Sequence, residues 1–370
     1  MKKMIYAFSL LFAAVLLSSC GSKKDDRILQ LSFDEGSGII VKDASGHMED
    51  AKLNYLYTNA AFTDSMDPQW RDCGIENGCL LFDGDSTFVS YDKDKISLGG
   101  DELSISVWIA PRAFEWDDPE AAENGREELT AIVSQYSKDK GQGLILGYER
   151  YGRVCFEVGA EDGWHTVWGD ACLSKDEWNY LVASYDGKDG QISLYLNGEL
   201  VGSDTVKDQA SIIPATKQKL LIGKSNTGHA IAAGTWQMFS GLMDELVIRS
   251  SKAAKEDAKP DRDIPAISYE DIGLENILTG DIYKTQYHGG PYAHWMNEPH
   301  APVYYNGMYH LFFQQNMTGT YWRNICWGHL ISEDLVNWHP VKEAITPTEN
   351  TVVPDGVWSG GAAYDKNGIP

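Results

Sequence analysis

The feature that most constrains the fold of this chain is a period-two alternation of apolar residues. Apolar side chains occupy every second position of the segment Leu103–Ile109 and alternate with Ser104, Ser106 and Trp108. Successive side chains of a β-strand point to opposite faces, so this spacing predicts a strand with one face in a core. We find no helix-period run of useful length between residues 28 and 250. This region therefore favours an all-β fold.

A hairpin signal supports the same interpretation. The apolar-alternating segment Gln191–Leu196 ends at Asn197-Gly198, and Glu199-Leu200-Val201 follows. Asn-Gly supplies two residues that tolerate positive φ, which a two-residue hairpin turn requires. Many short strands separated by turns indicate a β-sandwich.

Composition divides the chain of 370 residues into two folded regions joined by a linker. Hydrophobic residues make up 43% and there are twelve Trp, which indicates ordered domains, and the length allows two to three of them. We assign residues 28–250 to the sandwich. Residues 251–276 are charged and contain Pro260 and Pro265, so they predict a linker with one short helical turn. Residues 277–370 form the second domain.

Several segments of the first domain resemble the laminin-G-like, concanavalin-type jelly roll. The resemblance implies a fold more than a function, although such domains often bind carbohydrate and sometimes Ca²⁺. The matching segments are residues 31–38, 43–46, 82–89, 103–109, 178–180 and 241–248.

Three aspartates of this domain could provide oxygen ligands for a structural Ca²⁺ ion, namely Asp34, Asp43 and Asp244. The alternative, which we favour, is that they cap turns and strand ends. Trp164 and Trp168 lie in a Gly-rich segment and could stack on sugar or pack in a core. No other cofactor is expected.

The stretch Tyr292–His300, with the sequence YAHWMNEPH, carries the clearest chemical signal. Glu298 stands beside an amide, Asn297, and near an indole, Trp295, and a proline follows. Amides hydrogen-bond sugar hydroxyls, an indole stacks on a sugar ring, and a carboxylate can attack a sugar carbon. Alternatively, Glu298 is an N-capping residue in an aromatic-rich β domain.

Five ordered motifs in the last ninety residues resemble the start of the catalytic domain of glycoside hydrolase family 32, the invertases, levanases and inulinases. That family begins with Trp-Met-Asn-Asp-Pro-Asn. The matching segments here are Trp295–His300, Tyr309–Asn316, Trp322–His329, Ser332–Trp338 and Trp358–Ala362. The resemblance implies a five-bladed β-propeller, of which this segment would supply about two blades. The whole chain is then a concanavalin-like sandwich followed by the first blades of a truncated propeller.

The resemblance assigns roles residue by residue. It places Glu298 at the nucleophile of a retaining hydrolase of fructan or sucrose, where the family has Asp. His300 replaces the second Asn of the family motif. The positions that would bind sugar are Trp295, Met296, Asn297, Gln314, Trp322, Trp358 and Ser359. We interpret Trp327 and Trp338 as core residues, and His294 and His329 as structural.

A retaining glycosidase also needs a second carboxyl group as general acid/base. In the family this is a Glu in a Glu-Cys motif, which follows an Arg-Asp-Pro motif, and neither occurs after Trp295. We therefore expect these residues to be the N-terminal part of a longer protein and to be inactive alone. Two alternatives are a non-catalytic cell-surface carbohydrate-binding protein and, more weakly, activity on a sugar other than fructose.

Residues 1–20 predict a lipoprotein signal peptide. Lys2 and Lys3 precede an apolar run, and Leu17-Ser18-Ser19-Cys20 fits a lipobox in which Cys20 is lipidated. Residues 21–27 resemble the export tag of Bacteroidetes lipoproteins. The expected location is the outer membrane, at the cell surface, through a lipid anchor.

Charge and cysteines complete the expectations. The formal charge of −23 disfavours nucleic acid as a partner, whereas neutral sugars are unaffected. An exported protein permits disulfides. Cys73 and Cys79 could close a small loop, Cys155 and Cys172 could pair across strands, and Cys326 is interpreted as a buried thiol; the sequence does not fix the pairing.

Overall fold

The computed structural model describes residues 25–55, 69–116, 129–227, 230–231, 234–235, 237–273, 285, 287–291, 293–348 and 356–370. The predicted signal peptide, including Cys20, lies outside these ranges. Within them the regular structure is β, apart from the helix α2 (Tyr269–Ile272) and the 3-10 turn η2 (Lys138–Lys140). The all-β prediction is confirmed. No helix of the described residues is both long and apolar enough to cross a membrane.

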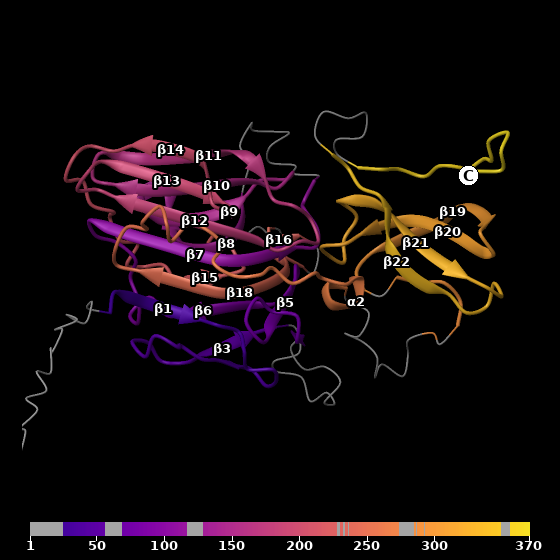
Figure 1. The fold of residues 1–370 in the computed structure, drawn as a ribbon, viewed down its shortest axis with the longest axis horizontal. Helices are drawn as coiled ribbons and strands as arrows, with labels where there is room; N and C mark the ends of the chain where they lie inside the picture. Colours follow the sequence, from indigo (N-terminus) through magenta and orange to yellow (C-terminus); the bar gives the residue numbers. More distant parts are fainter. Residues whose placement is uncertain are drawn as a thin grey trace, which may run out of the picture.

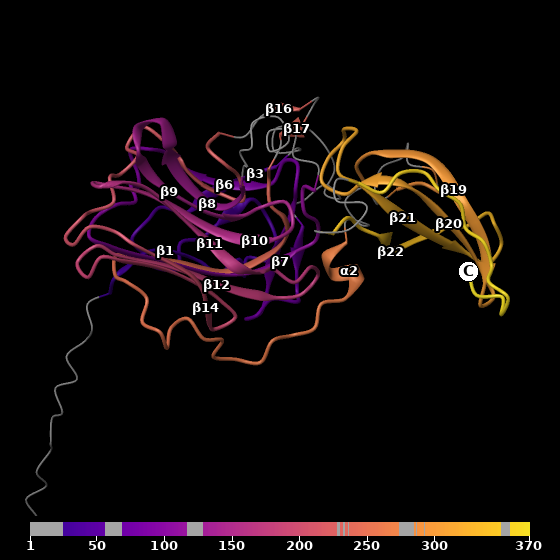
Figure 2. The same ribbon diagram turned by 90° about the horizontal axis from the view of Figure 1, so that it is seen from above.

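The first domain is a sandwich of two eight-stranded antiparallel sheets (Figures 1 and 2). The first sheet has the order β14 (Glu199–Thr205), β13 (Gln191–Leu196), β12 (Asn179–Asp186), β7 (Glu102–Pro111), β18 (Ser240–Arg249), β5 (Cys79–Asp83), β4 (Trp70–Arg71), with β1 (Arg27–Leu31) also on β18. The second has the order β11 (Gly163–Cys172), β10 (Arg153–Ala160), β9 (Gln142–Tyr148), β8 (Thr130–Ser137), β15 (Leu220–Ile222), β6 (Phe88–Tyr91), β3 (Ala51–Asn54), β2 (Ile40–Val41). A two-stranded ribbon of β16 (Ala230–Ile231) and β17 (Gly234–Thr235) completes the domain.

The apolar side chains that alternate along β7 fill the space between the two sheets, as predicted. Leu103, Ile105, Val107 and Ile109 are completely buried in the main core. The opposite face of β7 is covered as well, because Trp108 is only 3% exposed and belongs to a second apolar cluster. β7 is thus buried on both faces, and not half-buried as its sequence predicts.

The linker covers that second cluster. After β18 the chain runs back along the sandwich to α2 (Figure 2), and Ile267 and Ile272 pack with Trp108. Tyr180 donates from its hydroxyl to the Asp257 carbonyl at 3.1 Å. α2 begins at Ser268, whose side chain forms a capping box with Asp271. The short helical turn is confirmed, and the linker lies on the sheet.

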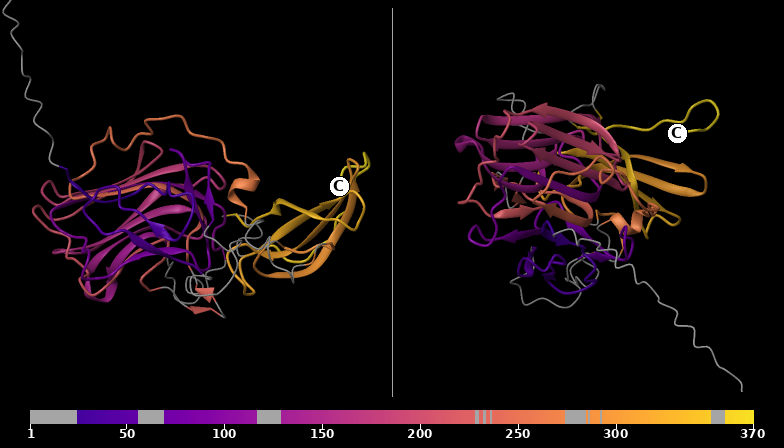
Figure 3. Two further views of the ribbon diagram at one scale, coloured as in Figure 1. Left: turned by 90° about the horizontal axis from the view of Figure 1, so that it is seen from below. Right: turned by 60° about the vertical axis from the view of Figure 1, so that its left-hand side comes forward.

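The second domain contributes one antiparallel four-stranded sheet (Figure 3). Its strands follow one another in chain order, as in a propeller blade. They are β19 (Met296–Tyr305), β20 (Met308–Asn316), β21 (Ile325–Ser332) and β22 (His339–Ile345). The described residues therefore form one blade where the sequence suggested about two, and their sheets do not close into a propeller.

Buried polar contacts join the two domains. Arg112, just after β7, is 5% exposed and donates to the Ser240 hydroxyl at 2.9 Å and to the Met317 carbonyl at 2.5 Å. His294 contacts the same carbonyl through Nδ1 at 2.9 Å. Because Met317 directly follows β20, the sandwich fixes one end of the blade.

Candidate active site

The site forms at an irregularity in the pairing of β19 with β20. Met296 pairs with Gln315 and Pro299 pairs with Phe313, so two residues, Asn297 and Glu298, lie opposite the single residue Gln314. This is a β-bulge, which re-aims side chains that a regular strand would send to opposite faces. It allows Asn297 and Glu298 to take part in the same network.

A chain of hydrogen bonds leads from Asn297 to Glu298. The Asn297 amide donates to Gln314 Oε1 at 3.3 Å, and Gln314 Nε2 donates to Ser359 Oγ at 2.8 Å. The Ser359 hydroxyl donates in turn to Glu298 Oε1. All three donors point toward the carboxylate, and bonds aligned in this way polarise one another. Four of the eight residues assigned to catalysis and sugar binding are therefore brought together.

The protonation of Glu298 follows from this network. The hydroxyl of Ser359 donates to the ionised carboxylate, which holds the pKa of Glu298 below its ordinary value. The side chain is exposed and is held by a hydroxyl, not by a buried cation. An exposed, ionised carboxylate is suited to nucleophilic attack and unsuited to donating a proton.

An aromatic pair stands beside the network. Trp322 and Trp358 stack with ring centroids 5.5 Å apart and planes 28° apart, and they are 51% and 49% exposed. The Trp358 carbonyl accepts a hydrogen bond from Trp327 Nε1 at 2.7 Å. Two half-exposed indoles next to a carboxylate form a surface on which a sugar ring could stack.

Trp327 belongs to the same surface, although its sequence suggested a core position. It is partly exposed on β21, opposite Gln314, and its ring contacts His300 and Phe312. No local sequence pattern marks this position, because it depends on the β20–β21 register, which aligns Trp327 with Gln314. Trp338 is also partly exposed and donates to the Leu335 carbonyl at 3.2 Å.

Trp295 and Met296 do not join the hydrogen-bonded network within the described residues. Trp295 acts through its backbone, which donates to the Gly319 carbonyl and accepts from the Asn316 amide, each at 3.1 Å. Met296 is half-buried and pairs with Gln315. These backbone contacts hold the start of β19, and the sugar-binding roles of the two side chains stay predictions.

A buried polar turn lies between β20 and Trp322. Asn316 Oδ1 accepts hydrogen bonds from the Thr318 amide, the Thr318 hydroxyl and the Gly319 amide, at 2.8, 2.9 and 3.2 Å. Asn324 donates to the same Thr318 hydroxyl at 2.9 Å. The sequence predictions did not include this turn; its signal was the cluster of short polar residues directly after a strand.

The three aspartates considered for Ca²⁺ each bind backbone amides. Asp34 accepts from Gly78, Asp43 from Gln30, Ser45, His47 and Met48, and Asp244 from Ile75, Glu76 and Glu245. Across the described part of the chain, no cluster of three or more His, Cys, Asp or Glu side chains is arranged to hold a metal ion.

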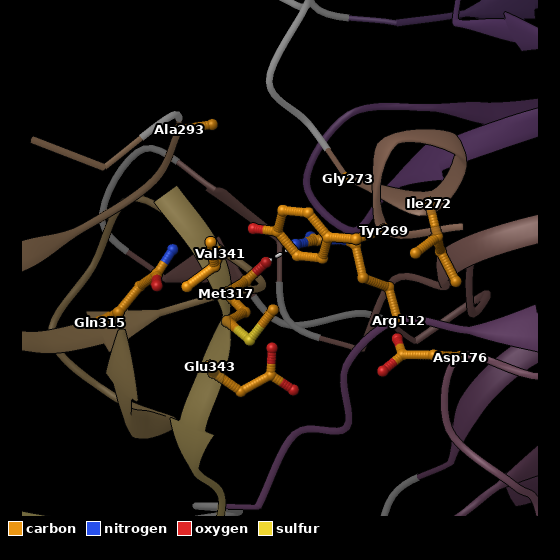
Figure 4. A pocket seen from close by; sticks show the side chains of 10 residues that line it. All are labelled: Arg112, Asp176, Tyr269, Ile272, Gly273, Ala293, Gln315, Met317, Val341 and Glu343. Atoms are coloured by element: carbon orange, nitrogen blue, oxygen red, sulfur yellow. Dashed lines mark hydrogen bonds between the residues drawn. The ribbon is translucent and has the colours of Figure 1, made fainter. Parts of the chain in front are cut away.

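A small cleft lies between the domains (Figure 4), and Glu298 is not among the residues that line it. Arg112, Tyr269, Met317 and Glu343 are among its lining residues. Lys175 pairs with Glu343, whose side chain is 4% exposed, and Lys342 pairs with Asp176 at 2.6 Å. These contacts form the seam between the domains.

Two family descriptions match the chain. Residues 288–369 match the "Glycosyl hydrolases family 32 N-terminal domain", and residues 83–257 match the "Concanavalin A-like lectin/glucanases superfamily". The first contains the site and the second covers most of the sandwich. Both resemblances found in the sequence are thereby confirmed at the level of the domains.

Several β-fructofuranosidases of plants are relatives of this chain. A cell wall isozyme from Pisum sativum is 46% identical over 88 residues, which are 24% of this chain and 16% of the relative. Insoluble isoenzyme 2 from Oryza sativa subsp. indica is 34% identical over 139 residues, 37% of this chain and 23% of the relative. The chain thus spans less than a quarter of the length of either relative.

Among solved structures, fructan 1-exohydrolase IIa from Cichorium intybus is 40% identical to the chain where the two align. The alignment covers 23% of this chain and 16% of that one, with a TM-score of 0.22.

Proposed function

We propose that this chain is part of a β-fructosidase-type glycoside hydrolase that acts on fructan or sucrose. One observation supports this above the others: the hydrogen-bond donors of Asn297, Gln314 and Ser359 lead to Glu298 within the segment that matches family 32. The plant relatives support the same substrate class through their names.

The reaction would be a double displacement. The Glu298 carboxylate attacks the anomeric carbon of a fructosyl unit, and the bond to the leaving oxygen breaks as a general acid protonates that oxygen. Water, deprotonated by the same group, then hydrolyses the covalent fructosyl–Glu298 ester and frees the carboxylate. Ser359 keeps Glu298 ionised, Gln314 and Asn297 orient the network, and the Trp322–Trp358 pair stacks on a sugar ring. In this proposal the acid/base comes from a part of the protein outside these 370 residues.

Replacement of the nucleophile tests the proposal directly. In the complete protein, Glu298→Gln should lower the rate of hydrolysis of sucrose, levan or inulin at least roughly 10³-fold, because the amide cannot form the glycosyl ester. Glu333→Gln is a matched control. It removes an exposed glutamate that follows the C-terminal end of β21, whereas Trp327, at the site, lies near the N-terminal end of that strand. Undiminished hydrolysis by the Glu298→Gln protein would exclude Glu298 as the nucleophile.

A carbohydrate-binding protein without hydrolytic activity is the second candidate. Glu298 is one methylene longer than the family Asp, and the half-exposed Trp322–Trp358 pair can bind a sugar without any chemistry. In that case wild-type protein and the Glu298→Gln variant would bind fructan equally well, and neither would release fructose. Release of fructose by the wild type alone would refute this candidate.

The proposed location is the outer surface of a cell, through a lipid on Cys20. The lipobox-like Leu17–Cys20 segment and the preceding apolar run support this proposal. Cys20→Ala should abolish incorporation of labelled fatty acid and release the protein from the membrane fraction. Retention of the label on the Cys20→Ala protein would contradict it.

A further inference from the structure

Two thiols at the base of a short loop lie close together. Cys73 follows β4 and Cys79 begins β5, and their Sγ atoms are 3.7 Å apart. A disulfide requires the two sulfurs to approach to about 2.05 Å, which rotation of the side chains can provide when the backbones are already adjacent. The β4–β5 ladder supplies this proximity, because Arg71 pairs with Cys79.

The loop between the two cysteines is held closed by independent contacts. Asp244 accepts from the Ile75 amide at 2.6 Å, and Asp34 accepts from the Gly78 amide at 2.9 Å. A Cβ atom added at Gly74 would lie 2.0 Å from the Gly78 carbonyl oxygen, so the two strands of the loop approach more closely than any side chain would allow. The cysteines on either side are thereby kept near each other in the folded protein.

The two thiols differ in the way that thiol–disulfide exchange requires. Cys73 is half-buried and reachable, whereas Cys79 is fully buried. The contact between the two sulfurs lowers the pKa of the Cys73 thiol, and the same contact together with burial raises the pKa of Cys79. Because Cys73 is the more exposed of the two, it is the attacking thiol and Cys79 the resolving one.

We propose that Cys73 and Cys79 are a disulfide site that a small-molecule disulfide oxidises in the folded protein. The Cys73 thiolate attacks one sulfur of the oxidant and expels the other as a thiolate. The Cys79 thiol then loses its proton and attacks the Cys73 sulfur, which expels the second thiolate. The two cysteines are oxidised by two electrons and the oxidant is reduced to two thiols.

The bond would strengthen the platform that supports the second domain. Arg71, on the same hairpin, donates to the carbonyls of Asp271 and Gly273 at 2.9 and 3.3 Å, where α2 ends. Cys73, Cys79 and Ile272 of α2 share one apolar cluster, against which Ala293 of the second domain also packs. A covalent link across this hairpin therefore limits the opening of the loop beneath the interdomain helix.

Peptide mapping tests the proposal on the 370-residue chain. Reduced protein is incubated in its folded state with oxidised or reduced glutathione, then denatured in acid, alkylated and digested with trypsin. Residues 72–93 form one tryptic peptide that contains both cysteines. After oxidation this peptide should be two hydrogens lighter than the dithiol and carry no alkyl group. Alkylation at both cysteines, a stable glutathione adduct or linkage of Cys73 to another cysteine would overturn the proposal.

Thermal unfolding tests whether the disulfide stabilises the hairpin. The main comparison is between two forms of the wild-type protein, so it does not require any variant to fold. Oxidised wild-type protein should melt about 5 °C above the reduced form, because a short closed loop restricts the unfolded chain. Cys73→Ser, at the half-buried position, should show equal melting temperatures under the two conditions. Equal melting temperatures of the two wild-type forms would refute the stapling of the hairpin.

Discussion

At the scale of single residues, the candidate site depends on which way each hydrogen bond points. Gln314 is 4% exposed, and its two amide atoms are fixed by Asn297 and Ser359. The resemblance to family 32 names Gln314, Ser359 and Glu298 from the amino-acid sequence alone. It does not predict that these residues are in contact, because their contact requires Ser359, 45 residues further along the chain, to fold back onto Gln314.

Removal of the Ser359 hydroxyl should shift the pH dependence of hydrolysis. Ser359 lowers the pKa of Glu298, so Ser359→Ala should raise that pKa toward its ordinary value. Glu298 must be ionised to attack, and the acidic limb of the kcat/KM profile should therefore move to higher pH. Rates well above both pKa values should change much less. Ser359→Thr keeps a hydroxyl and should keep the wild-type acidic limb; an unshifted limb in Ser359→Ala would contradict the role of Ser359.

At the scale of elements, the sequence predicted the regular parts and missed the irregular ones. Asn197 and Gly198 have φ of 51° and 91° in a two-residue hairpin, as their types indicated. The bulge at Asn297 and Glu298 follows no local pattern, because it depends on pairing with a strand that comes later in the sequence. Trp327 was misread for a similar reason: its side chain faces a site that only the β20–β21 register reveals.

The turn between β19 and β20 sets that register and can be tested alone. Asn306 and Gly307 have φ of 51° and 84°, and an added Cβ at Gly307 would meet no atom within 4 Å. Gly307→Ala should therefore destabilise the protein by about 1 kcal/mol, purely through backbone strain in the left-handed region. Gly290→Ala is the control, since Gly290 has equal space and no positive φ. Chemical denaturation measures the free energy of unfolding of both variants. If Gly307→Ala is as stable as Gly290→Ala, an alanine at position 307 introduces no backbone strain.

At the scale of the whole molecule, the two domains behave as one packed unit in the described structure. The linker lies on the sandwich, and Arg112 reaches across to the Met317 carbonyl, 205 residues further along the chain. Linker composition did not predict this docking, because a charged segment with prolines is typical of solvated spacers. The docking depends on apolar positions such as Ile267 and Ile272, spaced among charges, whose partners are on a distant sheet.

This interface should make stability depend on pH through His294. Burial, followed by the nearby charge of Arg112, lowers the pKa of His294 to about 4, compared with about 6.5 in an unfolded chain. Protonation then favours the unfolded state, so the contribution of His294 is complete above about pH 6.5 and is lost as the pH falls toward 4. The loss should amount to about 3 kcal/mol at most. His329, whose pKa burial also lowers to about 4, acts in the same direction and the same range.

His294→Gln separates the two contributions, because Gln can still donate to the Met317 carbonyl but does not titrate. The variant should retain the loss due to His329 and show a shallower fall in unfolding free energy between pH 6.5 and 4 than the wild type. His339→Gln, which removes an exposed histidine of β22, is the matched control. Denaturant titrations at several pH values measure all three proteins. If His294→Gln and the wild type lose stability equally between pH 6.5 and 4, the folded protein does not lower the pKa of His294, and the contact of His294 with the Met317 carbonyl makes no contribution to the pH dependence of stability.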